Sequence, residues 1–82
     1  MATTRYFAEQ VLRKRPYLSE ILCRIVLANP IRQETQPDGR IRVWGQVADP
    51  RDGSARFLRV VVLEDGITLH NAFFDRDFKA IP

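Results

Sequence analysis

The chain has 82 residues, of which 45% are apolar and 28% are charged, and its formal net charge is +3 at pH 7. A chain of this length forms one domain, which we expect over residues 1–82, with a small core and marginal stability. The apolar fraction argues against a disordered chain, and the lack of a long apolar run in the sequence predicts that nothing spans a membrane.

Cys23 is the one cysteine of the sequence, which excludes an internal disulfide and a thiolate metal cluster. No His-x-x-x-His spacing is present, and the four glycines stand at turn positions and form no phosphate-cradling loop. The first residues lack the apolar stretch of a secretory signal peptide. We therefore expect a cytoplasmic protein that uses no metal or other cofactor.

Residues 6–15 have the pattern of a first helix. Phe7 and Val11 recur at the spacing of one helix face, and Lys14 follows on the same face. The basic run at residues 13–15 places positive charge in the last turn, where it interacts favourably with the helix dipole, and a proline then ends the helix.

A second helix is expected to begin at Ser19, because a serine hydroxyl is a favoured N-cap acceptor. Its apolar residues follow at helical spacing and are Ile21, Leu22, Ile25 and Val26. Asn29-Pro30 ends this helix, since the residue before a proline avoids the helical conformation. Cys23 lies within the apolar part of the helix and is interpreted as a small buried hydrophobic residue.

After Pro30 the apolar residues recur with a period of two, which is typical of β-strands. We expect strands over residues 31–35, 40–47, 56–63 and 67–74. Gln36-Pro37-Asp38-Gly39 and Asp65-Gly66 favour tight turns, so successive strands should be antiparallel. The second strand alternates, with Ile41, Val43 and Val47 on one face and Arg40, Arg42, Trp44 and Gln46 on the other.

The length of the last hairpin loop fixes which side chains share a face of the sheet. A two-residue loop pairs Glu64 with Ile67 and Arg59 with Ala72. It places on the core face Leu58, Val60, Val62, Leu69, Asn71 and Phe73. It places on the opposite face Arg59, Val61, His70 and Ala72. A three-residue loop would move His70 to the core face.

The element order therefore predicts an α+β domain in which two N-terminal helices pack on a three- to four-stranded antiparallel sheet. The helices should cover the sheet face that carries Ile41, Val43, Leu58, Val60 and Leu69.

The opposite sheet face is basic and aromatic and gathers Arg40, Arg42, Trp44, Arg59 and His70. Arg76 and Lys79 can reach it from the C-terminal tail. Guanidinium groups neutralise phosphates, and a tryptophan ring stacks on an unpaired base. A histidine has the ordinary pKa best suited to acid–base catalysis near neutral pH. These residue types predict an RNA site.

Each of these residues also has an interpretation without function. The two arginines of the second strand are consistent with a solvated strand face, and the tryptophan with a cover for the sheet or a dimer contact. Arg59 could form an ion pair with Asp75 or Glu64. His70 could be an ordinary sheet histidine whose hydrogen bonds are satisfied.

Four segments resemble the RelE/ParE-like superfamily of bacterial toxins, nearest its BrnT-like branch. They are a basic-ended helix before Pro16, then LSEILCRIVLANP, DGRIRVWGQV and FLRVVVLEDGITLHNAFFDRDF. The resemblance covers residues 6–78. It implies a RelE-like fold, an antitoxin protein that covers the basic face, and ribonuclease activity in which a ribose 2′-hydroxyl attacks the adjacent phosphate.

Carried over by position, the resemblance assigns Arg40 and Arg42 to the arginine-bearing strand, Arg59 and His70 to the closing hairpin, and Arg76 to the tail. The sequence departs from the pattern at two places. Lys14-Arg15-Pro16 stands where the branch has Lys-His-Gly, and Asn71-Ala72-Phe73 stands where its closing strand ends in Ser-Ala-Arg. These departures concern the catalytic residues more than the fold.

The leading hypothesis is a toxin-type endoribonuclease of a toxin–antitoxin pair, acting on RNA. Its catalytic residues would be Arg42, Arg59 and His70, and its RNA-binding residues Arg40, Trp44, Arg76 and Lys79. One alternative is a non-catalytic protein-binding module or homodimer. Another is a toxin-fold inhibitor of a different enzyme, because a fold does not fix a function.

Overall fold

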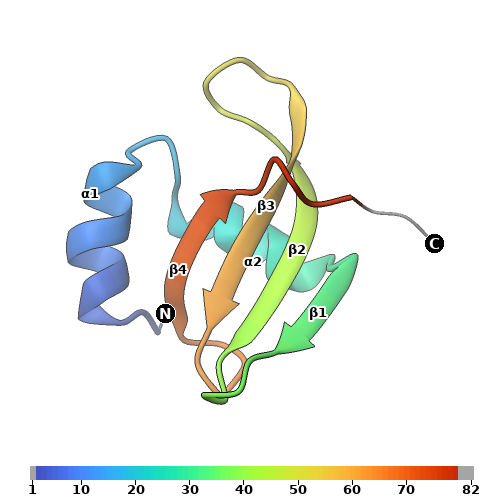
Figure 1. Cartoon of the computed structure of the whole chain (residues 1–82). Coiled ribbons are helices and arrows are strands. Elements are labelled where there is room, and N and C mark those ends of the chain that lie inside the picture. Colours follow the sequence, from blue (N-terminus) through green and yellow to red (C-terminus); the bar gives the residue numbers. More distant parts are fainter. Residues whose placement is uncertain (1, 80–82) are drawn as a thin grey trace.

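The computed structural model describes residues 2–79, in which helical segments precede four strands (Figure 1). The elements are η1 (Phe7–Val11), α1 (Leu12–Lys14), α2 (Glu20–Ala28), β1 (Arg32–Thr35), β2 (Ile41–Ala48), β3 (Ala55–Val62) and β4 (Leu69–Phe74). The strands form one antiparallel sheet in the order β1-β2-β3-β4. The expected α+β class is confirmed, with four strands. No helix within residues 2–79 is long and apolar enough to cross a membrane.

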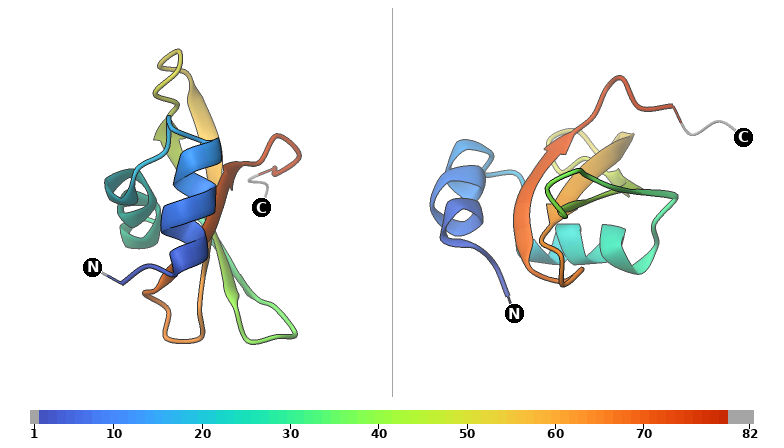
Figure 2. Two further views of the ribbon diagram at one scale, coloured as in Figure 1. Left: turned by 90° about the vertical axis from the view of Figure 1, so that its left-hand side faces the viewer. Right: turned by 60° about the horizontal axis from the view of Figure 1, so that its bottom comes forward.

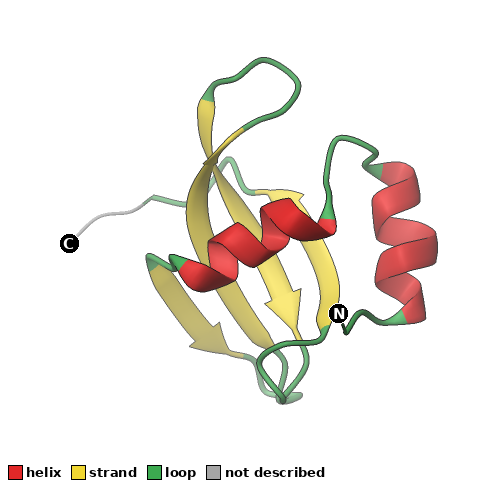
Figure 3. Ribbon diagram, turned by 180° about the vertical axis from the view of Figure 1, so that it is seen from behind, coloured by secondary structure: helices red, strands yellow, loops and turns green. Residues whose placement is uncertain are grey.

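Helix α2 crosses one face of the sheet (Figure 3) and buries the strand residues that alternation assigned to that face. Val43, Leu58, Val60 and Leu69 are buried, and Ile41 packs against them half-buried. The helix packs closely on the sheet at Gly45, where a Cβ atom would lie only 3.0 Å from Val26 Cγ1. The absence of a side chain at this strand position therefore sets the distance between the two layers.

The first helix packs beside β4 at the edge of the sheet (Figure 2). Phe7 and Val11 are buried as their spacing predicts, whereas Lys14, expected on the same face, is exposed. The reason is a π-helical turn, in which the Leu12 N–H bonds to the carbonyl of Phe7 five residues earlier. This extra residue per turn rotates the later positions away from the sheet.

The segment before this helix closes the outer edge of β4. Thr3 forms an isolated parallel bridge with Leu69, and the Thr4 N–H donates to the Leu69 carbonyl at 2.9 Å. The Thr4 hydroxyl then accepts the Phe7 N–H at 3.1 Å and caps the first helical turn. The strand β4 is thus hydrogen-bonded on both of its sides.

Helix α2 starts as its sequence predicts, with the Leu22 N–H donating to Ser19 Oγ at 3.1 Å. Its apolar face is only partly as expected. Cys23 and Val26 are fully buried, but the side chains of Ile21 and Ile25 are 70% and 46% exposed. The helix contacts the sheet through Cys23 and Val26. Ile21 and Ile25 therefore lie on the opposite side of the helix and face solvent.

The prediction of a two-residue loop in the last hairpin is wrong. The Leu63 N–H bonds to the Thr68 carbonyl, which leaves four residues in the loop. The Asp65 carboxylate organises the longer loop by accepting the Ile67 and Thr68 N–H groups at 2.9 and 2.8 Å. Gly66 takes a positive φ of 74° in this loop, a conformation open to glycine.

The pairing of β3 with β4 differs accordingly from the expected register. Arg59 lies opposite Phe73 and not Ala72, and a bulge follows in which the ladder skips His70. Ala72 is consequently buried in the core. Asn71 and Phe73 were both expected on the core face, but they pair with Val61 and Arg59 and lie on the outer face.

We expect Gly45→Ala to destabilise the fold by about 1–3 kcal/mol, because the new methyl group meets both Val26 Cγ1 and, at 3.2 Å, Val26 Cα. Urea unfolding followed by circular dichroism measures the change. Gln46→Ala, at the exposed neighbouring position, is the matched control and should change the unfolding free energy by less than about 0.5 kcal/mol. Equal stability of the two variants would contradict the close approach.

Candidate functional site

A row of alternating cations and aromatic rings crosses the outer face of the sheet, which is the face opposite α2. Cross-strand pairing aligns Arg32, Trp44, Arg59 and Phe73 on neighbouring strands. The Arg59 guanidinium carbon lies 5.6 Å from the Trp44 ring centroid and 4.9 Å from that of Phe73. Arg32 lies 5.9 Å from the Trp44 ring on its other side. We call these four residues the cation–π row.

Arg59 is thus held by rings and not by a carboxylate. Among the described residues it forms no ion pair with Asp75 or Glu64, the two partners considered from sequence. Its Nε atom is buried and has no hydrogen-bond partner in the described part of the chain. A guanidinium in this position keeps its positive charge available to an anion.

Trp44 is covered, in contrast to the open stacking plane expected from its strand position. Its side chain is 5% exposed, and its indole Nε1–H donates to Asp75 Oδ2 at 3.0 Å. The Phe78 ring stacks on it with a centroid distance of 5.2 Å and an interplanar angle of 14°. The C-terminal tail therefore closes this part of the outer face.

A pocket of about 360 Å³ lies on the same face, displaced from the cation–π row along the strands toward the β1–β2 turn and the start of β4. It is lined by Tyr6, Gln36, Arg40, Arg59, Val61, His70 and Asn71. We call it the histidine pocket. Three residues that sequence analysis selected, Arg40, Arg59 and His70, meet here. No carboxylate lies among these lining residues, although Arg40 Nη1 lies 3.6 Å from Asp38 Oδ2. Arg59 forms no ion pair among the described residues, so its charge favours an anionic ligand in the pocket.

His70 is fixed by the start of the first helix. Its Nδ1 atom lies 3.1 Å from the Thr4 hydroxyl, and its ring centroid lies 5.1 Å from that of Tyr6. Burial lowers the pKa of His70, the charge of Arg40 lowers it further, and Asp38 opposes this change. The imidazole is consequently neutral at pH 7, which is the form that can accept a proton.

Four lining residues of the histidine pocket were not selected from the sequence as functional residues: Tyr6, Gln36, Val61 and Asn71. Tyr6 belongs to the first helical turn and reaches His70 only through the packing of that turn beside β4. No local spacing connects positions so far apart. Asn71 was assigned to the core face through the incorrect hairpin register.

Arg42 and the two tail cations lie outside this pocket. Arg42 faces Glu34 across β1 and β2 at 3.8 Å and stands opposite Val61 in register, one strand away from the lining residues. Arg76 and Lys79 are exposed. Arg76 lines a second pocket, at the other end of β3.

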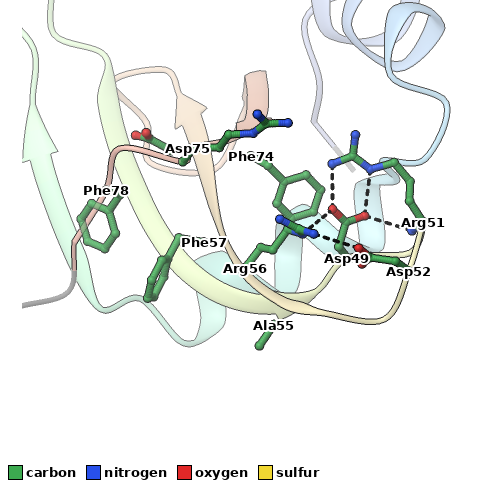
Figure 4. Close-up of a pocket in the computed structure, with 10 residues that line it drawn as sticks. Asp49, Arg51, Asp52, Ala55, Arg56, Phe57, Phe74, Asp75 and Phe78 are labelled. Carbon is green, nitrogen blue, oxygen red and sulfur yellow. Dashed lines mark hydrogen bonds and ion pairs between the residues drawn. The ribbon is translucent and has the colours of Figure 1, made fainter.

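This second pocket has a volume of about 530 Å³ and lies between the β2–β3 hairpin and the tail (Figure 4). Its floor is an ion-pair network in which a buried carboxylate, that of Asp49, meets two exposed arginines. Asp49 is 1% exposed and accepts hydrogen bonds from Arg51 Nε at 3.0 Å and from Arg51 Nη2 at 2.7 Å. Arg56 Nε forms an ion pair with the same carboxylate at 3.2 Å. The Arg51 guanidinium also stacks 4.0 Å from the Tyr17 ring centroid. The network fastens the hairpin to the body of the protein.

The remaining reactive groups are accounted for structurally. Cys23 is fully buried, and burial raises the pKa of its thiol to about 12, which makes it a poor nucleophile. Within residues 2–79 there is no group of three or more His, Cys, Asp or Glu side chains that could hold a metal ion.

Comparison of the chain with protein-family models, with curated proteins and with solved structures finds no significant match.

The Asp49 network makes a pH-dependent contribution to stability. Hydrogen bonds from Arg51 lower the pKa of Asp49 to about 2 from an ordinary value of 3.8. A lowered pKa stabilises the folded state above the unfolded-state pKa, and this stabilisation is lost as the pH falls through the folded-state pKa. The free energy of unfolding of the wild type should therefore fall between about pH 4 and pH 2.

In Asp49→Asn the decrease over this pH range should be smaller, as measured by thermal unfolding across the acid range. Asp77→Asn is the matched control, since Asp77 is exposed and forms no ion pair among the described residues. Identical acid profiles for the Asp49 variant and the wild type would show that the network does not titrate as described.

Proposed function

We propose that this chain is a toxin-type endoribonuclease whose site is the histidine pocket. The observation that carries the proposal is the meeting of Arg40, Arg59 and His70 in a pocket with no lining carboxylate. Two arginines there can neutralise a bound phosphodiester, and a neutral histidine beside them can accept a proton. The likeness of several segments to RelE/ParE-like toxins supports the same activity.

The reaction proposed is intramolecular transfer of the phosphoryl group. The tautomer of His70 that donates its Nδ1–H to Thr4 leaves Nε2 with a free lone pair. Nε2 takes the proton of a ribose 2′-hydroxyl as that oxygen bonds to phosphorus. The bond from phosphorus to the 5′-oxygen then breaks, and this oxygen takes a proton. The products are a 2′,3′-cyclic phosphate and a 5′-hydroxyl end.

The arginines act on the charge that develops during this step. Arg59 and Arg40 face the same pocket and can stabilise the phosphorane. Tyr6 lines the pocket beside His70 and is the hydroxyl best placed to protonate the leaving 5′-oxygen. Arg42, one strand away, is assigned to binding of the neighbouring phosphate, and an antitoxin protein is the partner expected to cover this basic face.

A second candidate function is a non-catalytic protein-binding module or homodimer. One observation favours it, the exposure of Ile21 and Ile25 on the outward side of α2. Adjacent exposed isoleucines on a helix are a common feature of protein contacts. This surface lies on the opposite side of the sheet from the histidine pocket.

Induced expression in a bacterial host tests the nuclease activity in cells, with growth and total RNA as the readouts. The wild type should arrest growth with loss of RNA. His70→Gln, Arg59→Lys and Arg42→Ala should each relieve the arrest. Arg13→Gln, at an exposed position of α1, is the control and should remain toxic. Arrest with intact RNA would instead indicate inhibition of another enzyme, and normal growth with folded protein would favour the binding module.

The purified protein allows the chemistry to be tested directly. We expect wild-type protein to convert an RNA oligonucleotide into fragments with 2′,3′-cyclic phosphate ends, and to leave the 2′-deoxy analogue intact. His70→Gln should lower the cleavage rate by about 100-fold or more, the usual scale of general acid–base catalysis. Cleavage of the deoxy analogue, or full activity of the His70 variant, would exclude the proposed mechanism.

A further inference from the structure

The burial of Trp44 has an unusual origin. The residue lies on the outer face of the sheet, which no helix within residues 2–79 covers, since α2 packs on the other side (Figures 1 and 3). In Figure 2 the segment after β4 runs along this outer face, on the side away from α2. We call residues Asp75–Phe78 the strap. The strap is the part of the described chain that stacks on the indole ring and accepts its N–H.

Few contacts hold the strap in place. The Asp75 N–H donates to the Phe57 carbonyl at 3.0 Å, and Asp75 Oδ2 accepts from Trp44 Nε1. Phe78 stacks on Trp44 and meets the Phe57 ring edge-on at 5.1 Å. Beyond Asp75 the strap forms no regular secondary structure, and the pocket of about 530 Å³ opens beside it (Figure 4).

The position of Phe78 is one that a nucleobase can take. Its ring is nearly parallel to the indole, at 14° and 5.2 Å, as is a base stacked on a tryptophan. Arg32 and Arg59 lie within 6 Å of the same indole ring. Arg59 forms no ion pair among the described residues and can meet a phosphate beside a stacked base, whereas Arg32 also pairs with Glu34 and would exchange that carboxylate for a phosphate. The pocket beside Phe78 is lined by three arginines and three aspartates, and Arg56 is paired with Asp49 and Asp52. Arg76 forms no ion pair among the described residues and adds positive charge along the path.

We propose that Trp44 is a stacking site for an unpaired base of single-stranded RNA, and that Phe78 occupies this site in the free protein. The proposal rests on RNA being the ligand of the basic face, as in the proposed function, and adds a base subsite and its internal competitor. An incoming base displaces Phe78, and the strap moves toward the adjacent pocket. Binding is therefore weakened by the fraction of molecules in which the strap is closed.

Trp44 is the one tryptophan of the chain, so its fluorescence reports on this site alone. In the wild type, a short oligoadenylate should quench the fluorescence as an adenine stacks on the indole. An abasic oligomer of the same length carries the same phosphates without bases and should leave the fluorescence unchanged. Magnetisation transfer between the Phe78 and Trp44 rings in NMR spectra should be lost when the oligoadenylate binds. These measurements use the wild-type protein and do not require any variant to fold.

Phe78→Ala removes the internal competitor. Acrylamide should then quench Trp44 more strongly, and oligoadenylate should bind about tenfold more tightly, as expected for a strap closed in about nine-tenths of molecules. Ile67→Ala, at a 58% exposed position in the β3–β4 loop, removes apolar surface without touching the strap and should leave both quantities unchanged.

Unchanged Trp44 fluorescence in the wild type with saturating oligoadenylate would overturn the proposal. So would weaker binding by Phe78→Ala, which would make Phe78 a contact and not a competitor. Displacement of the strap by a protein partner, with no response to RNA, would assign the site to that partner. The His70→Gln variant separates the two proposals. If oligoadenylate still quenches Trp44 in this variant while cleavage is lost, both proposals are supported. If oligoadenylate quenches Trp44 in a wild-type protein that cleaves no RNA, the base site is supported and the nuclease is not.

Discussion

The contact between α2 and the sheet at Gly45 is the constraint on which the rest of the structure depends. In this small domain, the residues of one helix and one sheet face supply most of the core, and Val26 reaches the strand backbone because Gly45 has no side chain. This contact commits the helix to one face. The other face of the sheet is covered only in part, by the strap over Trp44, and is otherwise organised by its own side chains.

The outer face meets this requirement with arginine and aromatic residues. Buried arginines commonly require a carboxylate, but Arg59 lies between Trp44 and Phe73, whose ring faces attract the cation and exclude water from its stem. The rings hold the Arg59 side chain in place, and the guanidinium charge is not paired with a carboxylate among the described residues. A surface of this kind is suited to a polyanion with flat bases, because it offers phosphate contacts and stacking planes at strand spacing.

Much of the fold could be predicted from sequence, because local rules and tertiary packing agree. Ser19 caps α2 as its side chain predicts, and the alternation in β2 assigns Val43 to the core. The last hairpin could not be predicted, since Asp-Gly is compatible with more than one loop length. The choice depended on the Asp65 carboxylate capturing two amide groups, which is a matter of geometry.

The candidate site was predictable in its residue types and less so in its arrangement. Arg59 and His70 share a pocket, as expected, yet they do so through a bulge that sequence patterns do not reveal. Trp44 is covered by the C-terminal tail, whose sequence shows no helical or strand pattern from which its position could be predicted. Tyr6 enters the site because a helix start packs beside β4.

The pairing of Thr3 and Thr4 with Leu69 also affects how the protein behaves in concentrated solution. An open sheet edge is a template on which other chains can add strands and build fibrils. Here the β4 edge is paired with the chain's own backbone at Leu69, and the other edge, β1, is only four residues long and carries Arg32 and Glu34. The basic face can therefore stay open to ligands while the sheet itself resists aggregation.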